Sequence, residues 1–296
     1  MSGPAGVERD VPMARLTTVG TGGPARWFAR PETAEALAAV LRWAGEERLP
    51  VAAVGLGSNL LAADTGFDGL VVRLAGDLAR VERDGERIVC GGGAALAVVV
   101  RRSQEWGLAG IEFGCAIPGT VGGAVRMNAG AYGGDLAGVL GRARVLSPGG
   151  ERSGGPAELG MRYRRSDLRP GEVVAEAVLR LRPEPTEVIR ATIRDMQRRR
   201  KEAQPSKVRT FGSVWKNPDP ERTAGRLLDE CGLRGFQIGG ARISPVHANF
   251  IENTGDATSA DVIALMLEAR RRARERFGVE LEHEVQMVGE IRLPEG

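Results

Sequence analysis

The chain has 296 residues, of which 42% are hydrophobic and 27% are charged, as is usual for a soluble globular protein of two or three lobes. No apolar run is long enough to cross a bilayer, the start has no signal-peptide segment, and the three cysteines form no CxxC pair, so we expect a cytoplasmic protein. Two histidines leave little material for a metal site or a Ser-His-Asp triad, and the net charge of +3 fits either GC-rich codon usage or a preference for anionic small molecules.

The first part of the chain predicts a βαβ-like unit. Residues 16–28 end as an apolar strand, and Thr33 is placed to cap the helix that follows. The apolar residues of this helix fall on one face: Ala34, Leu37, Ala38, Leu41 and Ala44. Pro50 closes the helix, and residues 51–54 and 69–74 have the composition of short buried strands.

The middle of the chain predicts a second group of strands around one helix. Residues 87–90 and 142–146 are short candidate strands, and 94–107 is a candidate helix with Gly107 in the terminating position. Residues 173–181 alternate with period two, which indicates a strand. Pro183 and Pro185 then mark the clearest domain boundary.

After this boundary we expect three helices and a last strand. Residues 186–204 form a basic helix, Thr223 caps a short helix through Cys231, and Thr258 with Asp261 begins a long helix. The buried face of that long helix is predicted to be Val262, Met266, Ala269, Ala273 and Phe277. Residues 279–288 alternate in polarity and predict a strand.

The stretch 114–134, GCAIPGTVGGAVRMNAGAYGG, has glycine at seven of its twenty-one positions and only one ionised side chain, Arg126. Such a density of glycine indicates positive φ angles or a close approach to the backbone. We interpret it as a backbone cradle for a phosphate-bearing cofactor; the alternative is a long solvated loop.

A second glycine-rich loop, GLGSNLL (55–61), directly follows a predicted strand. It lacks the third glycine of GxGxxG, and the P-loop pattern occurs nowhere in the chain. A pyrophosphate wrapped between the two loops would meet Ser58 and Asn59 as donors, whereas the plainer interpretation is a tight strand-to-turn connection.

Polar candidates for chemistry lie in three further places. Ser213 in GSVWKNP (212–218) has no histidine near it in sequence, which favours proton donation or binding over a nucleophilic role; an ordinary polar turn is the alternative. The arginines of MRYRRS (161–166) suit a carboxylate or phosphate, or else a solvated turn. Glu284 lies on the polar face of the predicted last strand.

We interpret the basic runs 198–201 and 270–276 as solvated helix faces and expect no nucleic-acid partner, since aromatic residues are only 4% of the chain.

Taken together, these segments resemble the UDP-N-acetylenolpyruvoylglucosamine reductase family, from about residue 17 to residue 289. The motifs that carry the resemblance occur in family order: TTVGTGGPA (17–25), GLGSNLL (55–61), IPGTVGGAVRMNAGAYG (117–133), YRRS (163–166), GSVWKNP (212–218), AGRLLDECGLRG (224–235), ISPVHANFIEN (243–253) and LEHEV (281–285). The chain is similar to the shorter form of the family, without the extra tyrosine-bearing loop of the longer form.

The resemblance implies an α+β fold with a two-subdomain FAD-binding domain of the vanillyl-alcohol-oxidase type (PCMH-type), followed by a smaller α/β substrate-binding domain. On this basis we expect FAD-binding subdomains at 1–75 and 76–184 and the substrate-binding domain at 185–296. The implied catalytic residues are Arg164, Ser213 and Glu284, and Lys216 and Asn217 match substrate-contacting positions. The implied cofactor-binding residues are Gly55, Gly57, Ser58, Asn59, Leu60, Ile117, Pro118, Gly119, Thr120, Gly122, Gly123, Ala124, Asn128 and Gly130.

The implied reaction is the NADPH-dependent reduction of the enolpyruvyl group of UDP-N-acetyl-3-O-(1-carboxyvinyl)-glucosamine to UDP-N-acetylmuramate, an oxidoreductase step on a CH–CH group in peptidoglycan precursor synthesis. In the family, hydride passes through N5 of FAD and a serine, here Ser213, gives the proton. The resemblance thus implies roles in cell wall biogenesis, cell shape, cell division and the cell cycle, with the UDP-sugar and NADPH as partners of a cytoplasmic monomer. The alternatives are another FAD-dependent oxidase of the same fold, or a basic nucleotide-binding protein.

Overall fold

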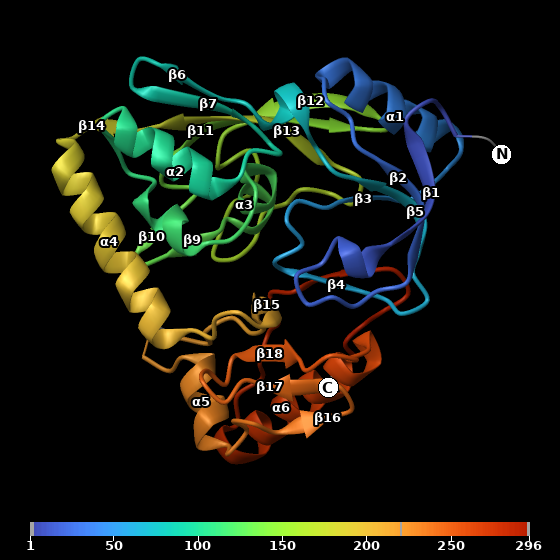
Figure 1. Cartoon of the computed structure of the whole chain (residues 1–296), viewed down its shortest axis with the longest axis vertical. Coiled ribbons are helices and arrows are strands. Elements are labelled where there is room, and N and C mark those ends of the chain that lie inside the picture. Colours follow the sequence, from blue (N-terminus) through green and yellow to red (C-terminus); the bar gives the residue numbers. More distant parts are fainter. Residues whose placement is uncertain (1–2, 220, 295–296) are drawn as a thin grey trace. The chain divides into compact units, whose positions relative to one another are not determined.

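The computed structural model describes residues 3–219 and 221–294 (Figure 1). The chain divides into two compact units that interleave along the sequence. Unit 1 comprises residues 1–9, 27–56 and 68–200, and unit 2 comprises residues 10–26, 57–67 and 201–296. The three domain ranges expected from the resemblance stay a prediction.

Unit 1 is built on an antiparallel sheet with the strand order β12-β11-β13-β7-β6 (Figure 1). The strands are β6 (Val81–Asp84), β7 (Arg87–Gly91), β11 (Leu140–Ser147), β12 (Gly150–Gly154) and β13 (Val173–Arg180). The predicted strands at 87–90, 142–146 and 173–181 are confirmed, whereas β6 and β12 were not predicted. Polar residues dominate these two outer strands, so they lack the apolar pattern that marks a buried strand.

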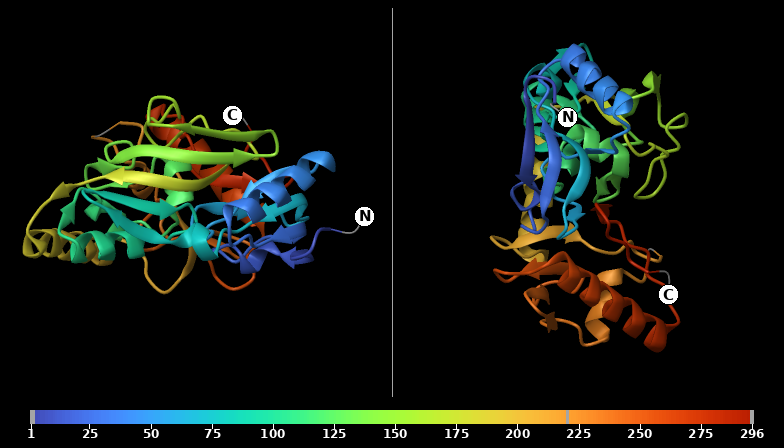
Figure 2. Two further views of the ribbon diagram at one scale, coloured as in Figure 1. Left: turned by 90° about the horizontal axis from the view of Figure 1, so that it is seen from above. Right: turned by 90° about the vertical axis from the view of Figure 1, so that its right-hand side faces the viewer.

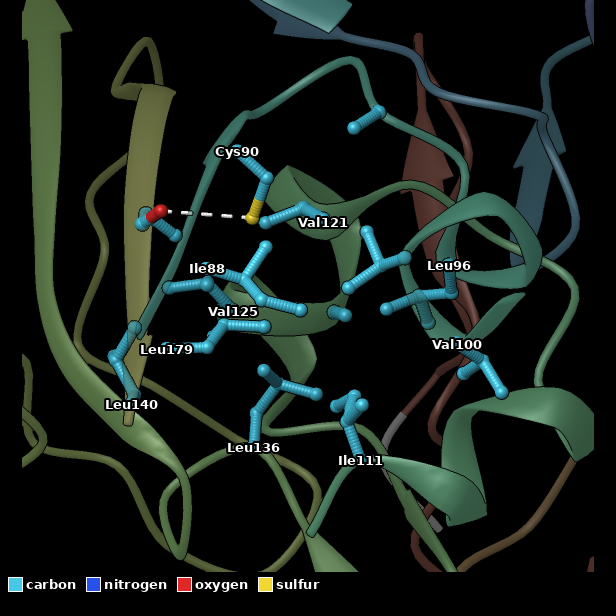
Figure 3. Packing of buried hydrophobic residues seen from close by; sticks show 14 of the residues in the cluster. Ile88, Cys90, Leu96, Val100, Ile111, Val121, Val125, Leu136, Leu140 and Leu179 are labelled. Atoms are coloured by element: carbon cyan, nitrogen blue, oxygen red, sulfur yellow. Dashed lines mark hydrogen bonds between the residues drawn. The ribbon is translucent and has the colours of Figure 1, made fainter. Parts of the chain in front are cut away.

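One core of unit 1 packs α2 (Leu96–Glu105) and α3 (Val121–Met127) against this sheet. Figure 3 shows the side chains that meet there, among them Leu96 from α2, Val121 and Val125 from α3, and Leu179 from β13. Cys90 lies in the same core, where burial raises the pKa of its thiol to about 12, so we expect it to be unreactive.

The other elements of unit 1 extend this core or form a second one. Near the first core lie η3 (Glu112–Ala116), β8 (Leu108–Ala109), β14 (Arg182–Pro183) and α4 (Thr186–Ala203). The second core contains α1 (Ala34–Glu46), whose N-terminus is capped by Thr33 as predicted. It packs beside strands of the order β1-β2-β5-β3, namely β1 (Val7–Pro12), β2 (Pro24–Ala29), β5 (Phe67–Val72) and β3 (Val51–Ala53), of which residues 10–12, 24–26 and 67 are counted with unit 2. The remaining elements of unit 1 are η2 (Gly76–Ala79) and the short pair β9 (Gly130–Ala131) and β10 (Gly134–Asp135).

Unit 2 contains an antiparallel sheet with α6 (Ser259–Phe277) along it, visible in the right-hand view of Figure 2. The sheet has the order β15 (Arg209–Ser213), β18 (Phe250–Asn253), β17 (Ala241–Ile243) and β16 (Gln237–Ile238). The predicted capping box of Thr258 and Asp261 is present, and the predicted buried face is confirmed except at Phe277, which is half-buried. The remaining elements are η1 (Met13–Arg15), β4 (Leu60–Ala62), α5 (Ala224–Glu230) and β19 (Gln286–Val288).

The predicted strand over 279–288 is wrong in extent. Only β19 is a strand, and it pairs in parallel with β4. Before it, residues 282–284 run antiparallel to 214–216, through the bonds from Lys216 N to Glu282 O and from Glu284 N to Val214 O, both 2.9 Å. The chain changes partner at Val285, which is buried, so the alternating pattern reflects two short pairings instead of one strand.

Candidate functional site

A cavity of about 200 Å³ in unit 1 has five glycines in its wall, together with small and aliphatic residues. Four of the predicted cofactor-binding residues line it: Gly55, Thr120, Gly122 and Gly123. Residues of both glycine-rich loops therefore line one cavity within unit 1. Two further glycines of the wall, Gly92 and Gly93, were not predicted as site residues, although they lie in the run of three glycines that follows the predicted strand at 87–90.

The glycines around this cavity permit backbones to approach more closely than any other residue would allow. A Cβ on Gly55 would lie 2.4 Å from Thr120 Oγ1, and one on Gly92 would lie 1.8 Å from the carbonyl oxygen of Val174. The stretch 114–134 is thus not a solvated loop. It contains η3, α3 and two short strands, and Thr120 caps α3 by accepting a bond from Gly123 N.

Backbone donors remain open where the two loops meet. Within residues 3–219 and 221–294, the N–H groups of Gly55, Leu56, Gly119 and Thr120 donate to no acceptor. Thr120 as a residue is only 6% exposed, and a buried N–H without a protein acceptor is costly unless water or a ligand accepts its bond. Open amides beside a glycine-walled cavity suit the phosphate oxygens of a nucleotide cofactor. The residues therefore fit the pyrophosphate-bearing part of FAD.

Three predicted cofactor residues of the same stretch have protein neighbours instead. Ala124 packs in the core, and a Cβ on Gly130 would meet Gly134 O at 2.5 Å. Asn128 is buried with a left-handed φ of 39°, and its amide bonds Asp135 Oδ2, Arg162 O and Ala137 N. Asn128 therefore holds the end of α3 to two neighbouring segments. Ile117 is half-buried and Pro118 exposed, and neither lines the cavity.

Arg164 stands in a two-residue turn of unit 1. Arg162 and Arg165 pair through both backbone bonds, at 2.9 and 3.0 Å, so Tyr163 and Arg164 form the tip. Arg164 has φ +55°, a left-handed conformation that is unfavourable for a side chain of this size. Its guanidinium carbon lies 5.1 Å from the centre of the Tyr163 ring. Strained backbone of this kind recurs at functional positions, and here it coincides with the predicted catalytic arginine.

In unit 2, the segments that carry Ser213 and Glu284 lie side by side through the 214–216 and 282–284 pairing. The loop 57–61 joins them, because Asn59 Nδ2 donates to Glu284 O at 2.9 Å and Gln286 N donates to Asn59 O at 3.0 Å. Gly212, with φ +84°, lies close to Ser58, since a Cβ on it would be 3.6 Å from Ser58 O. Unit 2 therefore brings together the pair Ser58 and Asn59 with Ser213 and Glu284, from three segments that are far apart in the sequence.

A buried amide fixes the strand around Ser213. Asn249 accepts from Trp215 N and donates to Trp215 O, both at 2.9 Å, and it is 4% exposed. Thr18 acts in a similar way, since its hydroxyl bonds Thr210 O at 2.6 Å and Gly57 O at 3.2 Å. Neither residue was predicted as part of a site, although both lie inside motifs that carried the resemblance.

The two predicted substrate-binding residues already have protein partners. Lys216 forms an ion pair with Glu282 and its side chain is 11% exposed. Asn217 Oδ1 accepts from Ala224 N at 3.1 Å, close to the capped start of α5. These contacts orient both side chains and leave the remaining hydrogens of each for a ligand.

The two histidines of unit 2 predict a pH dependence of stability. Burial lowers the pKa of both His247 and His283 below the ordinary value of 6.5. As pH falls below 6.5 the unfolded chain therefore binds protons before the folded chain does, and the free energy of unfolding decreases. We expect a lower melting temperature at pH 5.5 than at pH 7.5, and a weaker dependence in the His247→Gln, His283→Gln double variant. If the melting temperature of that variant still changed with pH as it does in the wild type, the effect would belong to other groups.

Within the described ranges, no group of histidine, cysteine, aspartate and glutamate side chains has the arrangement of a metal site. No described helix combines the length and the apolar character that a membrane crossing requires.

Comparison with known proteins agrees with this geometry. Residues 25–152 match the model of an FAD binding domain, which defines the chain as an FAD-binding protein and confirms the predicted α+β flavoprotein fold. Residues 204–288 match the model described as UDP-N-acetylenolpyruvoylglucosamine reductase, C-terminal domain. The chain belongs to the UDP-N-acetylenolpyruvoylglucosamine reductase family, as the resemblance implied.

Individual relatives match over nearly their whole length. A reductase of this name from Symbiobacterium thermophilum is 43% identical over 288 residues, which are 97% of this chain and 93% of the relative. Another from Sphingopyxis alaskensis is 45% identical over 280 residues, covering 94% and 93% of the two chains. The crystal structure of the Thermus caldophilus reductase superposes with a TM-score of 0.83 at 39% identity, over 96% of this chain and 99% of that one.

Proposed function

We propose that this protein is an FAD-containing, NADPH-dependent oxidoreductase that converts the enolpyruvyl UDP-sugar named above to UDP-N-acetylmuramate. The observation that carries the proposal is the 43% identity to the Symbiobacterium thermophilum reductase over 97% of the chain. The cavity supports it, because its open amides suit the phosphates of FAD. Cytoplasmic location, a monomeric state and roles in cell shape and division remain part of this proposal.

Bound FAD supplies hydride transfer between NADPH and the enolpyruvyl double bond. The chain's own residues must then bind the sugar nucleotide, stabilise the negative charge that develops beside its carboxylate, and deliver one proton. We assign charge stabilisation to the Arg164 guanidinium, with Glu284 assisting by a hydrogen bond. We assign proton delivery to the Ser213 hydroxyl, and sugar-nucleotide binding to Lys216 and Asn217. The cofactor contacts are assigned to loop 55–61 and to 117–123.

The sharpest test of the activity follows the flavin absorbance of the purified protein. We expect a yellow protein that NADPH bleaches without oxygen and that the enolpyruvyl UDP-sugar recolours. If oxygen but not the enolpyruvyl UDP-sugar restored the yellow colour, the rival, an FAD-dependent oxidase, would be favoured. A protein that binds no flavin would overturn the proposal altogether.

The proposed position of FAD predicts a selective effect of Gly123→Ala. A Cβ at this position would have Thr120 Oγ1 as its nearest neighbour, at 3.6 Å, so the protein itself has room for it, and alanine is the better helix former in α3. The added methyl would instead narrow the cavity. We expect unchanged melting of the apoprotein and about tenfold weaker FAD binding, measured by flavin fluorescence, because overpacking typically costs about 1–3 kcal/mol.

The matched control is Gly149→Ala, where the nearest atom to the new Cβ is Ser147 Oγ at 3.8 Å, in the turn between β11 and β12. Gly149→Ala should change neither the melting temperature of the apoprotein nor its affinity for FAD. Normal FAD affinity in Gly123→Ala would place the cofactor elsewhere.

A further inference from the structure

Arg126 is the one ionised side chain of the stretch 114–134, and it lies at the wall of the glycine-lined cavity, in the last turn of α3. Its guanidinium donates to three backbone carbonyls of a single downstream segment. The bonds run to Leu168 O at 3.4 Å, to Arg169 O at 3.1 Å and to Glu172 O at 2.9 Å. Such a set of bonds fixes the position of a backbone segment more firmly than a single side-chain contact.

The segment that Arg126 holds is itself a closed turn. Pro170 and Gly171, with φ +81°, are its central residues, and Glu172 N donates back to Arg169 O at 3.1 Å. The Glu172 carboxylate accepts from Arg169 N at 2.7 Å and from Arg152 at 2.7 and 2.8 Å. Burial lowers the pKa of the Arg126 guanidinium, and the nearby negative charge of Glu172 acts in the opposite direction. Glu172 therefore offsets part of the cost of burying the Arg126 charge.

A second set of bonds joins α3 to the turn that carries Arg164. Ser166 Oγ donates to the carbonyl of Arg126 at 2.7 Å, and Asn128 Nδ2 donates to Arg162 O at 3.1 Å. The Arg164 turn thus lies between two fixed points, Arg162 and Ser166, and the chain beyond it is held by the Arg126 guanidinium. Without such restraint a left-handed arginine would relax, since the conformation costs about 1–2 kcal/mol.

We propose that Arg126 and Ser166 are positioning residues that hold the Arg164 turn against α3, the helix whose first turn belongs to the proposed flavin site. The restraint of the turn follows from these hydrogen bonds alone, whereas its importance for catalysis rests on the proposed function. Neither residue needs to touch the substrate. In the YRRS motif, Ser166 then fixes the backbone two residues after the predicted catalytic arginine.

The experiment compares Arg126→Met, Arg126→Lys and Ser166→Ala with the wild-type holoenzyme. The control is Arg101→Met, which removes an exposed arginine of α2 whose side chain makes no hydrogen bond within the described residues. Hydrogen exchange of residues 160–168 reports the turn, and flavin absorbance reports cofactor content. Rapid mixing then measures flavin reduction by NADPH and flavin reoxidation by the enolpyruvyl UDP-sugar separately.

We expect exchange at 160–168 to rise about five- to tenfold in Ser166→Ala and more in Arg126→Met, because each loses hydrogen bonds that are individually modest. Arg126→Lys should restore part of the protection, since lysine retains the charge and one donor group. In the same variants, reoxidation by the substrate should slow about tenfold while reduction by NADPH and flavin content stay near wild type.

Unchanged exchange at 160–168 in both Ser166→Ala and Arg126→Met would overturn the proposal, whatever the activity. If exchange at 160–168 became faster while flavin reoxidation by the UDP-sugar stayed at the wild-type rate, the turn would not need this restraint for catalysis, and that part of the proposal would be overturned. Loss of flavin in Arg126→Met with normal exchange would make Arg126 a cofactor ligand instead. If the wild-type protein shows the expected protection but no reaction with the UDP-sugar, the proposed function fails and the structural role of the two residues remains.

Discussion

Replacing Ser213 by alanine is expected to slow the reoxidation of reduced flavin by the enolpyruvyl UDP-sugar by a factor of about 10²–10⁴, the usual range for loss of a positioned proton donor. Reduction of the flavin by NADPH should be nearly unchanged, because no proton from Ser213 is required in that half-reaction. Rapid-mixing absorbance measurements of the two half-reactions on the same preparation test this directly.

The physical reason for so large an effect is position and not acidity. A serine hydroxyl is a weak acid, so it is effective only if it is held beside the carbon that receives the proton. The surroundings of Ser213 provide such restraint. Its neighbour Gly212 has φ +84°, Val214 N donates to Asn249 O at 2.9 Å, and Val214 O accepts from Glu284 N. Ser213 is itself half-buried at the end of β15.

The control for this substitution is Ser153→Ala, which removes an exposed serine from β12 and should leave both half-reactions unchanged. Equal losses in both half-reactions of Ser213→Ala would contradict the assignment of Ser213 as proton donor. They would point instead to a disturbed fold of unit 2, which the melting temperature would reveal independently.

Local signals were sufficient to predict α1, α2, α4, α5 and α6 and much of the sheet in unit 1. Thr33, Thr223 and Thr258 each cap a helix in the structure, because capping depends on residues within one turn of the helix start. The helix α3 was missed, since Gly122 and Gly123 lower its intrinsic propensity. It forms because Thr120 caps it and because Val121 and Val125 are buried in the core of unit 1.

The arrangement of the candidate site depends on contacts that no local pattern contains. The pairing of 214–216 with 282–284 joins residues 66 positions apart at Lys216 and Glu282, and it divides what looked like one last strand. The bond from Asn59 to Glu284 O spans 225 positions. Local patterns could therefore offer the loops, the arginines and Ser213 only as candidates with plainer alternatives. Their specific roles come from the resemblance to the family and remain predictions.

Replacing Arg164 by methionine is expected to slow flavin reoxidation by the UDP-sugar by a factor of about 10²–10³, the range seen when one preorganised donor to a developing negative charge is lost. Arg164→Lys should have a smaller effect, since it keeps the charge but not the two-pronged geometry of a guanidinium. Flavin reduction by NADPH is the internal control, and it should stay within about twofold of wild type.

Arg164→Gly separates the role of the side chain from the strain of the backbone. Glycine adopts φ +55° freely and so removes a strain of about 1–2 kcal/mol, but it adds about 0.5–1 kcal/mol of chain entropy and loses the contact with the Tyr163 ring. These effects nearly offset, so we expect a melting temperature close to that of wild type together with reoxidation as slow as in Arg164→Met. If Arg164→Gly melted far below wild type while Arg164→Met did not, the arginine would be needed chiefly for the fold of the turn. A stable, flavin-loaded and inactive Arg164→Gly enzyme would instead mean that the strained backbone is retained for the sake of the guanidinium that it carries.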